Sequence, residues 1–445
     1  MNTEVLDERD FFRQLQEANQ KIFLKMIADY EAYISPILRS QGYKRINKKE
    51  RTVIFSFGEM TFSRSRWQKG NEIRFPVDEK LGLVPRSRFS TEFLYQMTSL
   101  SNVMPYRKVV SVMKLLKGIY ITKNSVQRAI ELSGKLLEEK EEYRILSLPE
   151  KEKKIKPEIL YIEGDGVWIK ETSTDSKRKS IELSHYVVHT GSEKGARNQL
   201  KNKREIISSY HEKAKEQLID LIHNDFEIDS DTVIVTNSDG GNGYSPRVFN
   251  EIAKTFQPKV HYHFWDAFHV HQSLKMNLRA YPSELLSKAF SAIKNRDKKG
   301  LEVVLDTAES LIESQEKQEQ FLSFKRRILG QFRYTASPKK KGLSSNGIGI
   351  VESQHRKITY RMKNRGMYWS RRGADTMSQT ILLSDKGTLR DLFFGDWRRD
   401  YKKIMSYEAN VGLLFAAPKS SYQLPFLKRR IRKQYKRVII RGIND

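Results

Sequence analysis

The sequence predicts an α/β protein in which a sheet domain with a helical insertion follows a mainly α-helical N-terminal region. Short β-branched apolar runs are typical of buried strands, and an amphipathic helix that carries Ile207 separates the second run from the third. After the fourth run, residues 272–336 return to helical spacing over a length that suits a helical insertion. Strands are expected at residues 158–170, 181–189, 232–236 and 259–264.

The N-terminal region is expected to begin with a helix and a hairpin. Residues 1–44 form a helical segment, because apolar residues recur there every three or four positions. In residues 45–90 the apolar period switches to two on either side of Gly58, which predicts a β-hairpin region.

Residues 91–140 return to helix and contain a candidate DNA reader. A turn at Gly118 precedes a second helix that opens on a Thr122 cap. Helix-turn-helix DNA readers have this arrangement, and the first residues of their second helix reach base edges. Helices joined in this way without DNA contact are also common. The residues that would meet DNA are Lys123, Asn124, Gln127 and Arg128.

The sheet domain is expected in two pieces, residues 157–271 and 337–385, on either side of the insertion. A basic C-terminal region, residues 386–445, follows. Within it, residues 428–441 hold eight cations and no acid, with apolar residues at helical spacing. This composition suits a basic helix on DNA, and it equally suits a solubilising tail.

The charge of the chain indicates a polyanionic partner. Its 81 Lys and Arg against 54 Asp and Glu give a net charge of +27, and each cation that meets a phosphate releases condensed counterions. An acidic membrane surface would attract the same charge, but no amphipathic anchor, membrane-length apolar run or signal-peptide pattern accompanies it. Cysteine is absent, which excludes disulfides and thiolate zinc sites. Nucleic acid is therefore the expected partner, and a membrane is not.

Three carboxylates carry the expected chemistry. Asp165 and Asp239 each follow an apolar run and precede a glycine, which places them at the edge of a rigid sheet, and Glu352 lies downstream. Converging carboxylates hold Mg²⁺ or Mn²⁺, and such ions support phosphoryl transfer. An Asp-Gly pair is also ordinary turn chemistry, so each aspartate by itself is weak support. Glu163 lies two residues from Asp165 on the same strand face and is an alternative first ligand.

A histidine cluster follows from the last predicted strand. His261 and His263 alternate on one strand face and are best explained as buried, hydrogen-bonded structural residues. Asp266 and His269 stand at the strand-to-helix junction, where they would shape the active site or contact DNA. Zinc binding is an alternative role for this cluster, which also includes His271. The chain offers no cysteine as a further zinc ligand.

A basic stretch follows Glu352. Residues 353–372 hold seven cations and no acid, interleaved with aromatic residues, and this pattern fits a DNA phosphate track with stacking platforms. A solvated basic face is the alternative. The expected DNA contacts are Arg356, Arg361, Lys363, Arg365 and Trp369.

Taken together, five blocks of the chain resemble the bacterial ISLre-type insertion-sequence transposases and, more distantly, the Mutator-like group. The similarity extends over most of residues 45–380. The blocks are residues 163–168 (EGDGVW), 238–241 (SDGG), 266–269 (DAFH), 346–352 (NGIGIVE) and 361–369 (RMKNRGMYW).

This resemblance implies an RNase H-like catalytic domain with an Asp-Asp-Glu triad. Asp165, Asp239 and Glu352 would then be the catalytic metal ligands, with Asp266 and His269 as accessory residues. It also implies a cytoplasmic bacterial enzyme, nucleoid-associated when bound to DNA, that acts as a homo-oligomer. Such an enzyme binds the terminal inverted repeats of its element and cuts and joins double-stranded DNA. Two alternatives stay open: an RNase H-like nuclease without strand transfer, and a non-enzymatic sequence-specific DNA-binding protein.

Overall fold

The computed structural model describes most of the chain. Its described residues are 7–147, 154–172, 179–193, 199–241, 243–343 and 348–414, with side chains up to residue 406. The chain divides into two compact units, Met1–Gly395 and Asp396–Asp445. The second unit contributes helix α15 (Trp397–Leu414), and the basic tail expected at residues 428–441 lies outside the described residues. None of the helices in the described part of the chain has the length and apolarity that a membrane span needs.

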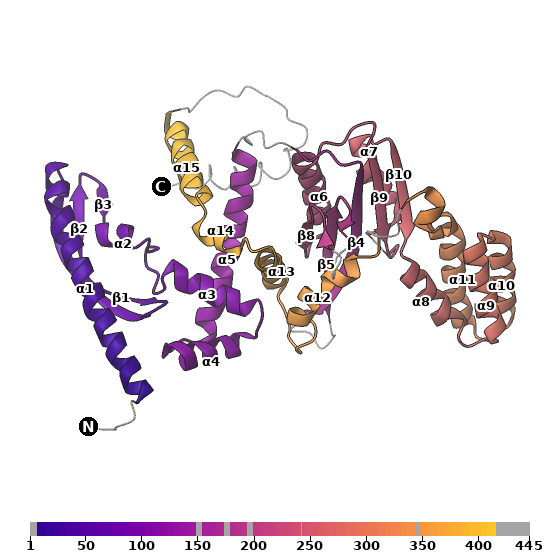
Figure 1. The fold of residues 1–445 in the computed structure, drawn as a ribbon, viewed down its shortest axis with the longest axis horizontal. Helices are drawn as coiled ribbons and strands as arrows, with labels where there is room; N and C mark the ends of the chain where they lie inside the picture. The colour runs from indigo at the N-terminus through magenta and orange to yellow at the C-terminus, as the bar shows by residue number, and fades with distance from the viewer. Residues whose placement is uncertain are drawn as a thin grey trace. The chain divides into compact units, whose positions relative to one another are not determined.

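The first unit begins with a long helix packed on a small antiparallel sheet (Figure 1). These elements are α1 (Glu8–Ser40), β1 (Lys44–Phe55), β2 (Gly58–Lys69), β3 (Glu72–Arg74) and α2 (Pro76–Lys80). Phe23 and Ile27 of α1 share a buried cluster with Phe62 of β2. β1 and β2 form a hairpin, as the sequence predicted. β3 is an additional strand of three residues, which is too short for the alternation of apolar residues to be recognised in the sequence.

Three helices follow: α3 (Thr91–Ser101), α4 (Tyr106–Lys117) and α5 (Lys123–Leu146). α4 ends at Gly118, whose φ of 63° lies in the left-handed region that glycine adopts freely. The Thr122 hydroxyl then accepts a hydrogen bond from the Ser125 N–H at the start of α5. The glycine turn and the capped second helix therefore lie where the sequence placed them. DNA reading by α5 stays a prediction.

α5 packs on the sheet domain. Its Ile130 shares a buried cluster with Ala374 and Met377 of α13 (Arg371–Asp385). Gly134 permits this close approach, because a Cβ atom there would lie 2.8 Å from the hydroxyl oxygen of Thr376.

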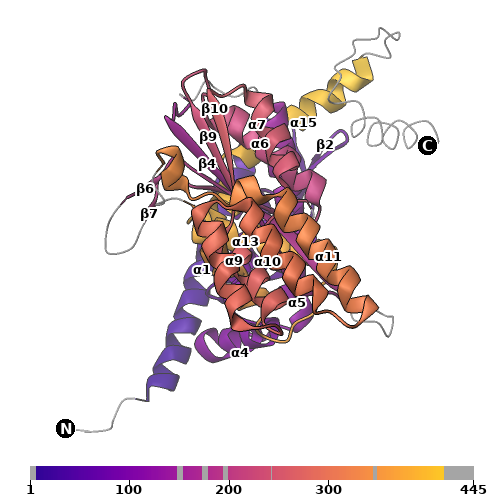
Figure 2. The same ribbon diagram turned by 90° about the vertical axis from the view of Figure 1, so that its right-hand side faces the viewer.

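The central sheet has five strands in the order β10-β9-β4-β5-β8. β4 (Ile159–Lys170), β9 (Val233–Ser238) and β10 (Val260–Trp265) pair in parallel, whereas β5 (Ser180–His189) pairs antiparallel with both β4 and β8 (Arg204–Ser208). Helices cover both faces (Figures 1 and 2). α6 (His211–Asp225) and α7 (Pro246–Phe256) pack on one face, and α12 (Val351–Met362) and α13 pack on the other.

β8 corrects one expectation. Ile207, which we expected in an amphipathic helix, lies in β8 and pairs with His185 of β5, and α6 begins only at His211. Ile206 and Ile207 are β-branched and complete an edge of the sheet, so cross-strand packing outweighs the helical spacing that the sequence shows. A two-stranded ribbon, β6 (Ser192–Glu193) and β7 (Gln199–Leu200), precedes this strand.

The predicted insertion is helical and has a core of its own (Figure 2). Leu274, Leu301, Leu305 and Ile328 are fully buried within it. Its elements are α8 (Ala267–Leu278), α9 (Ser283–Asn295), α10 (Lys298–Ser310), α11 (Gln315–Gly330) and the short turns η1 (Phe332–Thr335) and η2 (Pro338–Lys341). After α13, the short helix α14 (Leu389–Phe394) ends the first unit.

Candidate functional site

Three aspartates lie side by side where β9 and β10 end, and the one in β4, Asp165, lies within its strand because β4 continues to Lys170. The ladder aligns Gly164 of β4 with Ser238 of β9, and Ser238 with Trp265 of β10. The backbone N–H after Trp265 donates to the Ser238 carbonyl at 2.8 Å, so the register continues past the end of β10. The next residue in each of the three strands is an aspartate. Parallel pairing therefore brings together Asp165, Asp239 and Asp266.

The surroundings of Asp165 are strongly negative. Burial and, next, the neighbouring Asp239 carboxylate raise the pKa of Asp165 to about 6, although a hydrogen bond from the Gly166 N–H lowers it. That nitrogen is 2.7 Å from Asp165 Oδ1. Burial and Asp239 also raise the pKa of Glu182 on β5. Crowded carboxylates retain protons unless a positive charge neutralises them.

Asp266 orients His269 beside these carboxylates. Asp266 is the N-cap of α8, and its Oδ1 accepts hydrogen bonds from the backbone N–H of His269 at 3.1 Å and from its Nδ1 at 3.0 Å. Burial raises the pKa of Asp266, but the hydrogen bonds from His269 outweigh it and leave the pKa below its ordinary value. The hydrogen bond to Asp266 raises the pKa of His269, and the other two aspartates add to the effect. The charged form of His269 is therefore favoured at this edge of the sheet.

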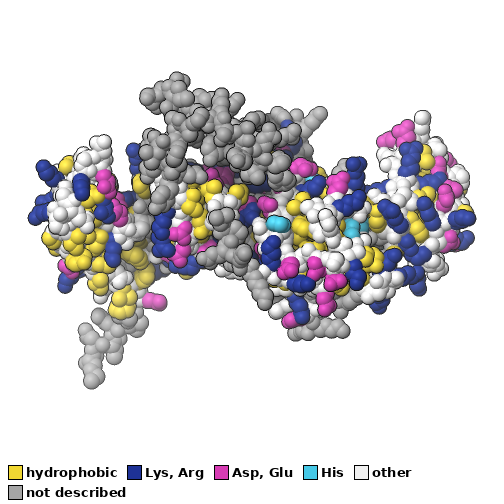
Figure 3. Space-filling model, turned by 90° about the horizontal axis from the view of Figure 1, so that it is seen from above, with side chains coloured by type: hydrophobic (Ala, Val, Ile, Leu, Met, Phe, Trp, Pro, Cys, Tyr) yellow, Lys and Arg dark blue, Asp and Glu magenta, His cyan; other side chains and the backbone are white. Residues whose placement is uncertain are grey.

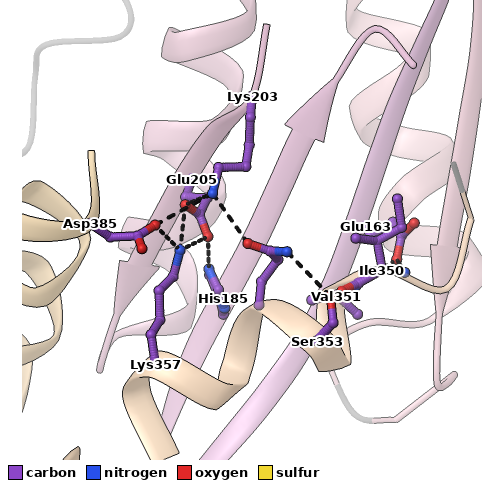
Figure 4. A network of polar contacts seen from close by, with 10 residues as sticks. Glu163, His185, Lys203, Glu205, Ile350, Val351, Ser353, Lys357 and Asp385 are labelled. Carbon is purple, nitrogen blue, oxygen red and sulfur yellow. Dashed lines mark hydrogen bonds and ion pairs between the residues drawn. The ribbon is translucent and has the colours of Figure 1, made fainter. Parts of the chain in front are cut away.

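Glu163 anchors the start of α12. Its side chain is 1% exposed, and its Oε2 accepts hydrogen bonds from the backbone N–H groups of Ile350 at 2.8 Å and Val351 at 3.0 Å (Figure 4). A carboxylate at a helix N-terminus satisfies free N–H donors and the helix dipole. Burial nevertheless raises its pKa to about 7. Glu163 Oε2 is therefore engaged with the start of α12, and Asp165 as the first ligand stays a prediction.

The anchored helix brings His355 close to Asp165 and carries Glu352 in its first turn. Gly349, with a φ of 82°, passes so close to Asp266 that a Cβ atom there would lie 3.4 Å from Asp266 Oδ2. Glu352, in the first turn of α12, has an exposed side chain. One turn later, Nδ1 of His355 lies 3.7 Å from Asp165 Oδ2. His355 was not among the predicted site residues, and its position one helical turn after Glu352 is the signal in the sequence that could have indicated it.

A partly exposed charge network holds the middle of α12 to the sheet (Figure 4). Lys357 of α12 donates hydrogen bonds to Glu205 of β8 at 2.8 Å and to Asp385 of α13 at 2.7 Å. Lys203 pairs with the same two acids, and His185 Nε2 lies 3.4 Å from Glu205. Burial raises the pKa of Glu205, but His185 and the lysines outweigh it and hold the pKa well below its usual range. Glu205 therefore stays ionised, and α12 is held at its middle as well as at its start.

The insertion reaches the site through Arg327. The carbonyl oxygen of Asp239 accepts hydrogen bonds from the indole N–H of Trp265 at 2.7 Å and from the Arg327 guanidinium at 3.0 Å. The guanidinium also lies over the Trp265 ring, 5.3 Å from its centroid. Gly240 has a φ of 69°, and a Cβ atom there would lie 3.0 Å from the side chain of Gln331. The turn after β9 is therefore held between the sheet and the insertion.

His261 and His263 are both hydrogen-bonded, His263 in a buried and His261 in a partly buried position, and a structural role for them stays a prediction. Each has a ring nitrogen 2.8 Å from the hydroxyl oxygen of Thr236. Burial lowers the pKa of His261 to about 4 and that of His263 to about 3. Both rings are therefore neutral at physiological pH.

The residues expected to read DNA all lie on the outside of α5. Lys123, Asn124, Gln127 and Arg128 are exposed in its first two turns. The Gln127 amide donates a hydrogen bond to Glu131 at 3.0 Å, within the same helix. The surface that would meet a DNA groove is thus accessible, and its contact with DNA stays a prediction.

The basic stretch after Glu352 divides into exposed and buried members. Arg356, Lys363 and Arg365 are exposed. Arg361 is fully buried, and its Nε donates a 2.6 Å hydrogen bond to the Ser101 carbonyl at the end of α3.

Trp369 is 5% exposed and donates a hydrogen bond from its indole to the Met362 carbonyl. The Arg361 guanidinium also lies 5.1 Å from the centroid of the Trp369 ring. We expected Arg361 and Trp369 on a phosphate track, but in this structure both side chains hold α12 and the segment after it inside the fold. The reason is that helical residues three apart lie on nearly the same face, and Arg361 falls on the same buried face as Ile358.

The donor set suits a hard divalent cation. Asp165 and Asp239 offer carboxylate oxygens, and the charge of Asp239 already contributes to the raised pKa of Asp165. Among the described residues, no three His, Asp or Glu side chains are placed so that they could jointly hold a metal ion. The chemistry of the pair of aspartates fits Mg²⁺ or Mn²⁺, and a third ligand would have to come from a side chain that is farther away in this conformation.

Known proteins resemble the chain along most of its length. The family model described as "Uncharacterised protein family (UPF0236)" matches residues 1–398. A relative from Streptococcus gallolyticus, described as "UPF0236 protein in vanSb 3'region", is 30% identical over 396 residues, which cover 86% of this chain and 81% of the relative. A solved structure, the Drosophila P element transposase strand transfer complex, matches 74% of this chain and 88% of its own at 9% identity, but its TM-score of 0.23 is too low to define the fold. The family model and the bacterial relative show that the chain belongs to the UPF0236 family.

Proposed function

We propose that the protein is a bacterial insertion-sequence transposase with an RNase H-like catalytic domain. The observation that carries the proposal is the strand register that sets Asp165, Asp239 and Asp266 side by side. A mixed five-stranded sheet, covered by helices on both faces and with acidic residues in β4 and directly after β9 and β10, supports this fold assignment. The anchoring of α12 at the same edge by Glu163 supports a contribution from Glu352.

Asp165, Asp239 and Glu352 would hold the divalent cation, Mg²⁺ or Mn²⁺. When bound, such an ion supplies Lewis-acid polarisation of the phosphodiester and a more acidic bound water. Glu163 fixes the start of α12 and therefore the direction from which Glu352 approaches the two aspartates. His355 lies beside Asp165, with its Nδ1 3.7 Å from Asp165 Oδ2.

His269 is the proposed contact to the phosphate that is attacked. Asp266 holds its Nδ1, so Nε2 is left to donate to a phosphate oxygen. The raised pKa of His269 favours the imidazolium, which attracts the negative phosphodiester. Because the backbone N–H of His269 is also bound by Asp266, the ring is positioned before any substrate arrives.

The remaining surface would present double-stranded DNA to this site. The net charge of +27 favours a polyanion, and Lys and Arg side chains are spread over the face seen in Figure 3. The start of α5 is the proposed reader of the element's terminal repeats. Arg356, Lys363 and Arg365 are the proposed phosphate contacts close to the catalytic helix. We place the enzyme in the bacterial cytoplasm, as a homo-oligomer on transposon ends and target DNA.

The test is cleavage and strand transfer by the full-length protein on DNA that carries the sequences flanking its gene. Asp165→Asn, Asp239→Asn and Glu352→Gln should each abolish Mg²⁺-dependent cleavage, because each removes an anionic ligand with little change in volume. Their thermal unfolding and DNA binding should stay close to wild type. Asp231→Asn is the matched control, because Asp231 is exposed at the opposite end of β9.

Each outcome has a distinct meaning. Wild-type cleavage by one of the three variants would remove that residue from the triad. Cleavage without joined products would favour the nuclease, and DNA binding without any cleavage by the wild type would favour the non-enzymatic DNA-binding protein.

A further inference from the structure

α1 carries two apolar stripes, and the described chain covers only one of them. Phe23 and Ile27 are buried against the small sheet, and Leu38 is buried with Trp67 of β2. The second stripe lies on another side of the helix. Its members are Phe11, Leu15, Ile22, Met26 and Tyr33, which are 45%, 47%, 67%, 50% and 67% exposed.

The exposed stripe has a regular repeat. Phe11, Ile22 and Tyr33 follow one another at intervals of eleven residues, and so do Leu15 and Met26. An eleven-residue repeat corresponds to about 3.67 residues per turn, close to the about 3.6 of the helix itself. The stripe therefore follows one nearly straight line along α1 for about 33 Å at about 1.5 Å per residue. The part of this line from Phe11 to Ile22 suits a second helix that lies alongside.

The first half of α1 packs on no other described element. Figures 1 and 2 both show its first turns extending away from the small sheet. From residue 8 to residue 22, every side chain is exposed except the half-buried Gln16. The apolar side chains of this segment are therefore open to a partner.

We propose that this partner is α1 of a second copy of the chain, bound in antiparallel orientation. The register that sets Phe11 opposite Ile22 of the second copy also sets Leu15 opposite Ala18 of the second copy. The contact is two-fold, so each pairing occurs twice. All four side chains lie in the segment that has no packing within its own chain.

The charges along α1 favour the antiparallel arrangement. The first turns carry the exposed acids Glu8 and Asp10, and the following turns carry the exposed cations Lys21 and Lys25. Antiparallel pairing sets the acidic end of one helix beside the cations of the other. A parallel pair in register would instead bring Asp29 against its own copy, because Asp29 lies on the stripe.

The mass of the full-length protein in solution tests the contact. We expect a dimer at micromolar concentration, with a dissociation constant raised at least about tenfold by Leu15→Glu or Ile22→Glu, since each would bury a charge. Leu24→Glu is the matched control, because Leu24 is 37% exposed on the opposite side of α1. A monomeric wild type, or equal weakening by all three variants, would overturn the proposal.

Disulfide cross-linking tests the orientation. The chain has no cysteine, so every disulfide that forms must join two introduced cysteines. Phe11→Cys combined with Ile22→Cys should form a covalent dimer on oxidation. Phe11→Cys alone should not, because the two copies of position 11 are about 16 Å apart along antiparallel helices. Cross-linking by the single variant would indicate a parallel pair, and failure of the double variant would overturn the register. Neither experiment contains DNA or metal, so their outcome is independent of the proposed catalysis.

Discussion

The carboxylate of Glu163, inside β4, accepts a 3.0 Å hydrogen bond from the backbone N–H of Val351, the first residue of α12. Asp165 follows two residues after Glu163, and Glu352 follows directly after Val351. One buried contact therefore connects the two distant segments that carry the first and last members of the proposed triad. Free N–H donors at the helix start explain how a carboxylate is accommodated in the core.

Glu163 should make the stability of the protein depend on pH. Its pKa is about 7 in the native state, against 4.5 for an ordinary glutamate, so the native state holds a proton that the unfolded chain has lost. The free energy of unfolding should therefore fall as pH rises from 4.5 to about 7, by up to about 3 kcal/mol, and then level off.

Glu163→Gln should remove this decline, because an uncharged amide oxygen still accepts both N–H groups. Urea unfolding across this pH range measures the effect, with the exposed Glu216→Gln as the control. Parallel curves for the wild type and Glu163→Gln would contradict the assignment.

Arg361 should matter for folding more than for DNA contact. Arg361→Ala removes a buried guanidinium that bonds the Ser101 carbonyl, and we expect it to lower the free energy of unfolding by about 2–4 kcal/mol. Arg365→Ala makes the same change at an exposed position and should stay within about 0.5 kcal/mol of wild type. Denaturant unfolding compares the two, and equal stabilities would show that the buried contact is not needed.

Arg356 and Lys363 should contribute to the salt dependence of DNA binding. Each lost phosphate contact lowers the magnitude of the log–log salt slope by about 0.9, so the double alanine variant should lower it by about 1.8. Specific and unrelated DNA should be affected alike. The control is Lys288→Ala with Lys294→Ala, an equal charge change on the exposed side of α9. If both double variants keep the wild-type slope, the stretch after Glu352 is a solvated surface.

Arg128 should instead affect sequence preference. If its side chain reaches a base edge, Arg128→Ala should cost about 1–3 kcal/mol on the cognate end and little on unrelated DNA. Lys135→Ala, farther along the exposed side of α5, is the charge-matched control. Competition binding distinguishes the two effects, and an unchanged preference would leave α5 as a scaffold helix.

Local patterns in the sequence determined the α/β class, the hairpin, the glycine turn before α5 and the helical insertion. Periodicity and turn chemistry act over a few residues, so they can be read without knowing what packs against them. The same local pattern, an apolar run followed by a carboxylate and a glycine, also singled out Asp165 and Asp239 for the sheet edge.

Contacts between distant segments were decided only by the tertiary structure. Ile207 lies in a strand because β5 offers it an edge, and Asp266 joins the other two aspartates because β10 pairs in register with β9. Arg361 and Trp369 turn inward because α12 presents that face to the core, which a run of cations cannot reveal. Glu163 binds the start of a helix almost two hundred residues away, and no local pattern encodes a contact between segments so far apart.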